Sequence, residues 1–100
     1  MVKKIFKIRS EVWLYPGMSG WHFLTIPKKE ASEIKVKFGS LKRGFGSLPV
    51  LVILGKSKWN TSIFPDKKSE TYLLPLKAKV RKKEKIFLDD FVIFSIRVLG

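Results

Sequence analysis

The sequence of 100 residues contains no cysteine, which excludes a disulfide scaffold, thiolate catalysis and zinc sites that need sulfur ligands. Its only histidine is His22, so most metal sites and nucleophile–base arrangements lack their usual imidazole. Acidic residues are also few: 8 aspartates and glutamates stand against 21 lysines and arginines, for a formal net charge of +13. We therefore expect a protein that is not an enzyme and that carries no metal or other cofactor.

Long apolar runs are missing as well. The longest, Leu48 to Leu54, contains Pro49 and is far shorter than the roughly 18 residues that a membrane span requires. Near the amino terminus, Lys7, Arg9 and Glu11 interrupt the pattern, whereas a signal peptide needs about 7–15 uninterrupted apolar residues. We expect a cytoplasmic protein without a membrane span.

What the chain does contain is enough apolar material for one core. Hydrophobic residues make up 45% of it and aromatic residues 13%, which argues against disorder. Because domains typically run to roughly 100–150 residues, we expect residues 1–100 to form a single domain.

Alternation and short apolar runs predict strands. Phe6, Ile8, Val12 and Leu14 share one side of the first segment, and this period of two is typical of a half-buried strand. Similar signals predict five more strands, at Trp21 to Ile26, Leu48 to Leu54, Lys58 to Phe64, Thr71 to Leu74 and Phe91 to Leu99. The last is mostly apolar on both sides, which predicts a central strand buried on both faces.

A first helix is expected between the second and third strands. Ala31, Ile34 and Phe38 recur at spacings of three and four, which predicts a helix over Lys28 to Phe38. The segment from Gly39 to Ser47 is polar and rich in glycine, and we expect it to be a mobile loop.

A second helix is expected to begin at Pro75, because Leu76, Val80 and Phe87 recur roughly at helical spacing. Six strands and two short helices in a chain of this length predict a mainly β fold, a small closed or split six-stranded barrel. An open α+β sheet is the alternative, but it would leave the second face of the last strand uncovered.

The polar residues that could carry chemistry have simpler structural explanations. A lone His22 on a strand is more often a packed or edge histidine than a general base. Asp89 and Asp90 are adjacent, so they point apart in a strand and cannot converge like a glycosidase pair. We expect them to form the turn into the last strand.

Three stretches of the sequence resemble a known family: Pro16 to Phe23 (PGMSGWHF), Thr61 to Pro65 (TSIFP) and Tyr72 to Lys82 (YLLPLKAKVRK). Their order and spacing resemble the domain of unknown function DUF1905, over about Val12 to Val98. The resemblance implies a small, mainly β barrel found in prokaryotes, without an established activity and without catalytic or cofactor residues to carry over. Similar chains tend to have Gly-Asp before the last strand, where this chain has Asp89-Asp90.

Basic residues gather in two short stretches, and nucleic acid is the partner they favour. The candidate contacts are Lys3, Lys4 and Lys7 in the first strand and Lys77, Lys79, Arg81, Lys82, Lys83 and Lys85 in the second helix. On that helix, Lys77, Arg81 and Lys85 would share one face at spacings of four, where like charges repel. Because no known reader motif is present, any binding is expected to be directed at the phosphate backbone and weakly specific. A lysine-rich surface that only maintains solubility is the simpler explanation.

The main alternative is a ligand-binding barrel for a small anionic or aromatic molecule. Its candidate pocket residues are the aromatic, hydroxyl and cationic side chains Trp21, Trp59, Thr61, Ser62, Tyr72 and Arg81. A purely protein-interacting domain and association of the basic helix with a membrane surface are further possibilities. The sequence is compatible with a monomer or a homodimer.

Overall fold

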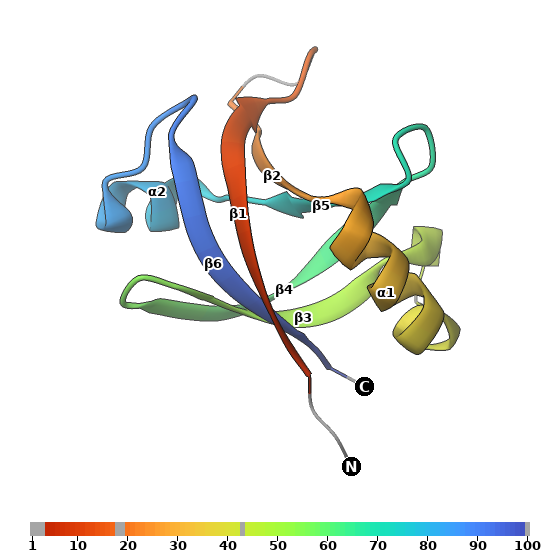
Figure 1. Ribbon diagram of the computed structural model, residues 1–100. Coiled ribbons are helices and arrows are strands. Elements are labelled where there is room, and N and C mark those ends of the chain that lie inside the picture. The colour runs from red at the N-terminus through yellow and green to blue at the C-terminus, as the bar shows by residue number, and fades with distance from the viewer. Residues whose placement is uncertain (1–3, 18–19, 43, 100) are drawn as a thin grey trace.

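The computed structural model describes residues 4–17, 20–42 and 44–99. Six strands and two helices follow one another along the chain (Figure 1): β1 (Ile5–Leu14), β2 (His22–Ile26), α1 (Lys28–Phe38), β3 (Leu48–Leu54), β4 (Ser57–Asp66), β5 (Thr71–Pro75), α2 (Ala78–Glu84) and β6 (Phe91–Val98). The strands pair antiparallel in a closed barrel of order β1-β2-β5-β4-β3-β6. This confirms the predicted mainly β fold, in its closed form.

The pairings that close the barrel differ in length. Seven residue pairs join β1 to β6 and seven join β3 to β4, whereas three join β1 to β2 and three join β4 to β5. The chain thus forms one long sheet, β1-β6-β3-β4, with the β2-β5 pair attached to it through short ladders.

The core lies inside the barrel and follows the alternation of the strands. In β1, Phe6, Ile8 and Val12 are buried while Lys7, Arg9 and Glu11 between them are exposed, as the period of two predicts. Leu14, predicted on the same side, is 45% exposed because it lies at the end of the strand.

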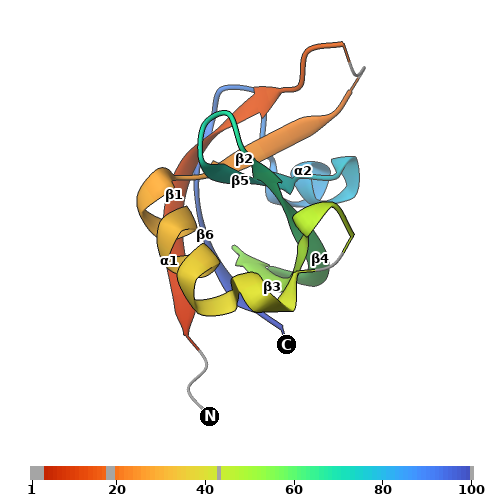
Figure 2. The same ribbon diagram turned by 90° about the vertical axis from the view of Figure 1, so that its right-hand side faces the viewer.

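The two helices cover opposite sides of the barrel (Figure 1, Figure 2). α1 has the predicted bounds and buries Ala31 and Ile34 in the core. Its last residue, Phe38, packs edge-on against Phe6, with ring centroids 6.5 Å apart. The following segment, expected to be a mobile loop, contains two short 3-10 turns at Gly39–Leu41 and Gly44–Gly46.

α2 is shorter than predicted. Pro75 is the last residue of β5 and pairs with Phe23, and the amide of Leu76 donates to the carbonyl of His22 at 2.9 Å. Strand pairing therefore continues where the sequence suggests a helix start. The helix ends at Glu84, so Phe87 lies beyond it and is 69% exposed rather than part of an apolar stripe.

β6 is central, as predicted, since it pairs with both β1 and β3. Its expected burial on both faces is wrong: Phe91 and Ile93 are each 57% exposed on the outer surface. The reason is that a single-layer barrel buries only the inner side of each strand, and neither helix lies over this part of its outside. The Arg9 guanidinium lies 4.3 Å from the centre of the Phe91 ring.

Asp89 and Asp90 form the turn into β6. Asp89 adopts φ 74°, and the Asp90 carboxylate accepts a hydrogen bond from the Phe87 amide at 2.8 Å. The turn prediction is confirmed. Within the described part of the chain, neither helix is long and apolar enough to cross a membrane.

Candidate functional site

The candidate site lies where β4 and β5 separate. These strands pair only at Phe64↔Leu73, Pro65↔Tyr72 and Asp66↔Thr71. Earlier in β4 the chain pairs with β3 alone, while the end of β5 pairs with β2 and then turns into α2. A gap in the barrel wall results.

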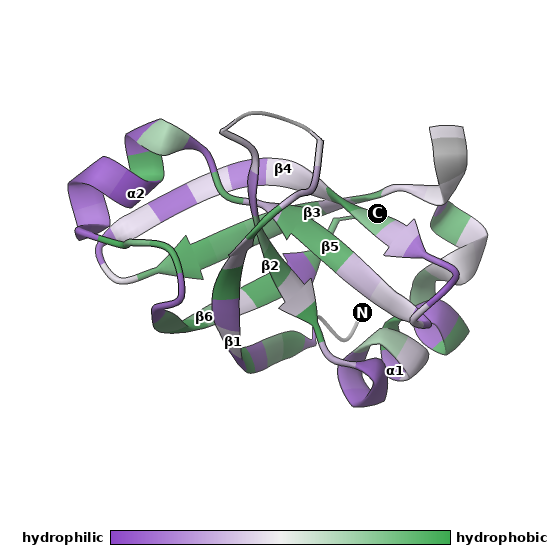
Figure 3. Cartoon of the chain, turned by 90° about the horizontal axis from the view of Figure 1, so that it is seen from above, coloured by the Kyte–Doolittle hydropathy of each residue, from purple (hydrophilic) through white to green (hydrophobic). Residues whose placement is uncertain are grey.

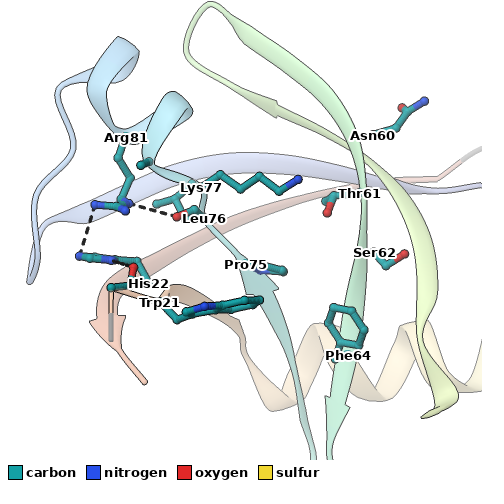
Figure 4. Close-up of a pocket in the computed structure, with 12 residues that line it drawn as sticks. Trp21, His22, Asn60, Thr61, Ser62, Phe64, Pro75, Leu76, Lys77 and Arg81 are labelled. Carbon is teal, nitrogen blue, oxygen red and sulfur yellow. Dashed lines mark hydrogen bonds between the residues drawn. The ribbon is translucent and has the colours of Figure 1, made fainter. Parts of the chain in front are cut away.

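A cavity of about 680 Å³ occupies this gap, a volume within the range of roughly 300–1,000 Å³ that is common for small-molecule sites. Its walls come from the start of β2, from β4 and from the segment joining β5 to α2 (Figure 4). The lining residues are Gly20, Trp21, His22, Asn60, Thr61, Ser62, Phe64, Pro75, Leu76, Lys77, Ala78 and Arg81.

One wall of the pocket is aromatic. Trp21 is 50% exposed and Phe64 is 40% exposed, so both rings are available to a bound molecule. The Trp21 ring stacks on the Phe23 ring, with centroids 6.0 Å apart. The Phe23 centroid also lies 5.5 Å from that of Trp13 and 5.4 Å from that of Tyr15. These neighbouring rings support Trp21 from behind, so a planar ligand meets a partly fixed surface.

The opposite wall is cationic, and its guanidinium is held in place. Arg81 donates from Nε to the Leu76 carbonyl at 3.1 Å and from Nη1 to His22 Nε2 at 3.5 Å. Because a carbonyl only accepts, the 2.9 Å contact between His22 Nδ1 and the Gly20 carbonyl places the proton on Nδ1 and leaves Nε2 to accept from Arg81. Of the five N–H groups of a guanidinium, two are thus used and three remain for a ligand.

Lys77 adds a second positive charge, since its side chain extends from the start of α2 toward Thr61 on β4 (Figure 4). No acidic residue lines the pocket in the described part of the chain. The one acid of α2, Glu84, accepts a hydrogen bond from the Ser57 hydroxyl at 2.6 Å instead. The positive charge of the pocket is therefore not neutralised locally.

Four of the six predicted pocket residues meet here: Trp21, Thr61, Ser62 and Arg81. Trp59 and Tyr72 do not line the pocket, because both pack with the core inside the barrel. Burial raises the pKa of the Tyr72 hydroxyl. Strand alternation alone could not separate the two groups, because the gap depends on where β4 stops pairing with β5.

Sequence reasoning missed other parts of the site. The sequence favours a purely structural role for His22, yet this residue lines the pocket and holds Arg81. Phe64 and Pro75 face the pocket from adjacent strands, and only the strand order reveals their proximity. Lys77, predicted as a nucleic-acid contact, also lines the pocket, in its cationic wall.

The predicted nucleic-acid contacts fall into two separate places. Lys79, Lys82 and Lys83 are exposed on α2, but Lys77 precedes the helix and Lys85 follows it with φ 56°. The expected single helical face of Lys77, Arg81 and Lys85 is therefore wrong, because only Arg81 lies within the helix.

The basic residues of β1 lie elsewhere. Lys4 pairs with Glu33 of α1, and α1 lies across the barrel from α2 (Figure 1). Lys7 is exposed on the outside of β1, and Lys3 lies outside the described residues. Figure 3 shows α2 as a mostly hydrophilic segment at one extreme of the molecule.

Fold and site together define a class: a small, strongly basic six-stranded barrel with a pocket in its wall, aromatic on one side and cationic on the other. The family model described as "Domain of unknown function (DUF1905)" matches residues 9–96. The chain therefore belongs to this family, which confirms the resemblance seen in its motifs. No curated protein matches the chain significantly.

Proposed function

We propose that this protein binds a small planar anion in the pocket between β4, β5 and α2. The observation that carries the proposal is the pairing of an aromatic wall, Trp21 and Phe64, with the anchored guanidinium of Arg81 in one cavity. A ring can stack on the indole while an attached carboxylate or phosphate accepts from Arg81 and Lys77.

The state of Arg81 before binding supports this proposal. A guanidinium that already donates to Leu76 and His22 loses little conformational freedom when an anion arrives, so more of the interaction energy contributes to affinity. The absence of an acidic side chain among the described lining residues favours a negatively charged ligand over a neutral or positive one.

Binding without catalysis is part of the proposal. The imidazole of His22 uses Nδ1 for Gly20 and Nε2 for Arg81, which makes it a support for the guanidinium. The hydroxyls of Thr61 and Ser62 would then orient the ligand by hydrogen bonds.

Calorimetric titration with matched probes tests the proposal. Indole-3-carboxylate and thymidine monophosphate carry both ring and charge; indole and thymidine carry only the ring; acetate and inorganic phosphate carry only the charge. We expect the ring-bearing anions to bind at least about tenfold more tightly than either partial probe, because both walls are then used. Equal affinity for the complete and partial probes would contradict the proposal.

Substitution of Arg81 provides a second test of the proposed function. Arg81→Gln should weaken binding by about tenfold or more, since hydrogen bonds to charged groups contribute about 1.5–3 kcal/mol. The control Lys29→Gln, at an exposed position of α1, removes the same charge far from the pocket and should leave affinity unchanged. Circular dichroism of each variant checks that the barrel is retained.

Nucleic-acid binding through the basic residues is the second candidate. It is favoured by the three exposed lysines of α2, Lys79, Lys82 and Lys83, which belong to the helix that contributes Arg81 to the pocket. Binding that also uses Lys4 and Lys7 stays a prediction, and anisotropy of a labelled strand with Lys7→Gln tests it.

A further inference from the structure

We propose that the pocket takes one nucleotide unit of a single-stranded nucleic acid, whose backbone continues over α2. This inference rests on the proposed function, because it names the molecule to which the planar anion belongs. It is carried by the position of the α2 lysines relative to the pocket.

The outward surface of α2 begins at the pocket rim. Ala78 lines the pocket, and Lys82 lies one turn further on, so the two are neighbours on the helix surface. Lys79 precedes Lys82 by three residues and Lys83 by four, which makes these three lysines a second, adjoining strip. All three are exposed, so a chain of phosphates leaving the pocket meets successive positive charges.

The opposite side of α2 is used for packing. Val80 packs against the core, and Glu84 is drawn to Ser57. The carboxylate of Glu84 also lies over Gly55, where an added Cβ would come within 2.1 Å of Oε1. The only acid of the helix therefore faces the barrel, and the lysine strip keeps its charge.

The strip extends beyond the reach of a small ligand. A free mononucleotide that stacks on Trp21 and binds Arg81 fills the pocket and leaves Lys79, Lys82 and Lys83, none of which lines it, without contacts. A longer strand uses all three, since single strands are held by a cationic track together with aromatic rings on which bases stack.

A single strand fits this arrangement better than a duplex. The Trp21 ring lies in a pocket in the barrel wall, and a base must leave its stack to reach it. Bases in a duplex are already stacked on their neighbours, so their ring faces are closed to Trp21.

Length and salt dependence test the inference. Affinities are measured by calorimetry and anisotropy for thymidine monophosphate and for oligothymidylates of two, four and eight nucleotides. We expect at least about a tenfold gain from one to four nucleotides. If the five cations Lys77, Lys79, Arg81, Lys82 and Lys83 each meet one phosphate, log affinity should fall against log salt with a slope of roughly −3.5, from about −0.7 per phosphate.

Two triple variants supply the matched comparison. Lys79→Gln, Lys82→Gln and Lys83→Gln together should reduce the slope to roughly −1.4, since three contacts of about −0.7 are lost, and should leave mononucleotide affinity unchanged. The control, Lys29→Gln, Lys35→Gln and Lys67→Gln, removes the same charge from exposed positions on α1 and the β4–β5 turn. It should retain both the length gain and most of the slope.

Several outcomes would overturn the inference. One is a mononucleotide that binds as tightly as the octamer, because the proposed function would then stand without the strand. Another is a length gain that survives in the α2 triple variant, and a third is a duplex that binds as tightly as a single strand of equal length. If none of the ring-bearing anions binds at all, the proposed function itself fails and the inference fails with it.

Discussion

The contact between the β3–β4 turn and the end of α2 makes a sharp prediction about stability. Gly55 lies in that turn with φ +59°, and a Cβ added there would lie 2.1 Å from Glu84 Oε1. Gly55→Ala therefore has two costs: an L side chain in the left-handed region, and displacement of the Glu84 carboxylate from Ser57.

The two costs can be separated because the chain offers a matched glycine. Gly17 has φ +77°, and a Cβ added there would meet nothing within 4 Å, so Gly17→Ala measures the backbone cost alone, about 1 kcal/mol. Losing the hydrogen bond between Ser57 and the carboxylate adds about 2 kcal/mol at a partly buried site. We expect Gly55→Ala to lower the free energy of unfolding by about 3 kcal/mol in total.

Urea unfolding followed by tryptophan fluorescence measures these differences. In a Glu84→Ala background the clash is absent, so Gly55→Ala should cost only about 1 kcal/mol. The coupling of about 2 kcal/mol in this double-mutant cycle is the expected signature of the contact. Equal costs for Gly55→Ala and Gly17→Ala would show that Glu84 moves aside freely, and the reasoning would be refuted.

Two further predictions concern α1. Ile34→Ala should destabilise the barrel by about 3 kcal/mol, because the Ile34 side chain is fully buried and its loss leaves a cavity. The control Val36→Ala, at a position that is 86% exposed, should be nearly neutral in the same urea assay. Equal effects of the two substitutions on the free energy of unfolding would contradict the packing of α1. Hydrogen bonds from Lys4 and then Lys37 lower the pKa of Glu33 below its ordinary 4.5, so its stabilising contribution is complete above that pH and is lost as the pH falls through the lowered pKa. Glu33→Gln should therefore be less stable than the unmodified protein at pH 6, and this difference should shrink as the pH falls below 4.5. A difference that stays constant as the pH falls would exclude this ion pair as its source.

Much of the fold can be predicted from the sequence because barrel strands bury one side only. The alternation in β1 identifies Phe6 and Ile8 as core residues, and the spacing in α1 identifies Ala31 and Ile34. Local patterns of this kind reflect burial directly.

Predictions that depended on neighbouring strands were less successful. Pro75 suits a helix start, yet pairing with Phe23 keeps it in β5. Phe91 and Ile93 are apolar enough for burial, but nothing in the described chain covers their outer face fully. The first error arises because tertiary pairing outweighs local propensity, and the second because a single-layer barrel buries only one side of each strand.

The candidate site could be predicted only in part, because its residue types are visible in the sequence but the pairing of its strands is not. Residue type alone points to Trp21 and Arg81, since a ring and a fixed cation suit a planar anion. The exclusion of Trp59 and the inclusion of Phe64 depend on where β4 stops pairing with β5. That boundary arises from the closure of the whole barrel.

The short ladders that join β2-β5 to the rest of the barrel have a consequence for its motions. Three residue pairs hold β1 to β2 and three hold β4 to β5, whereas the long sheet has seven at each of two seams and four at the third, between β3 and β6. Opening of the wall should therefore begin at the short seams, where amide protons would exchange with solvent faster than those of β6. Because the pocket lies across one of these seams, a bound molecule would connect β4 to α2 and slow that exchange.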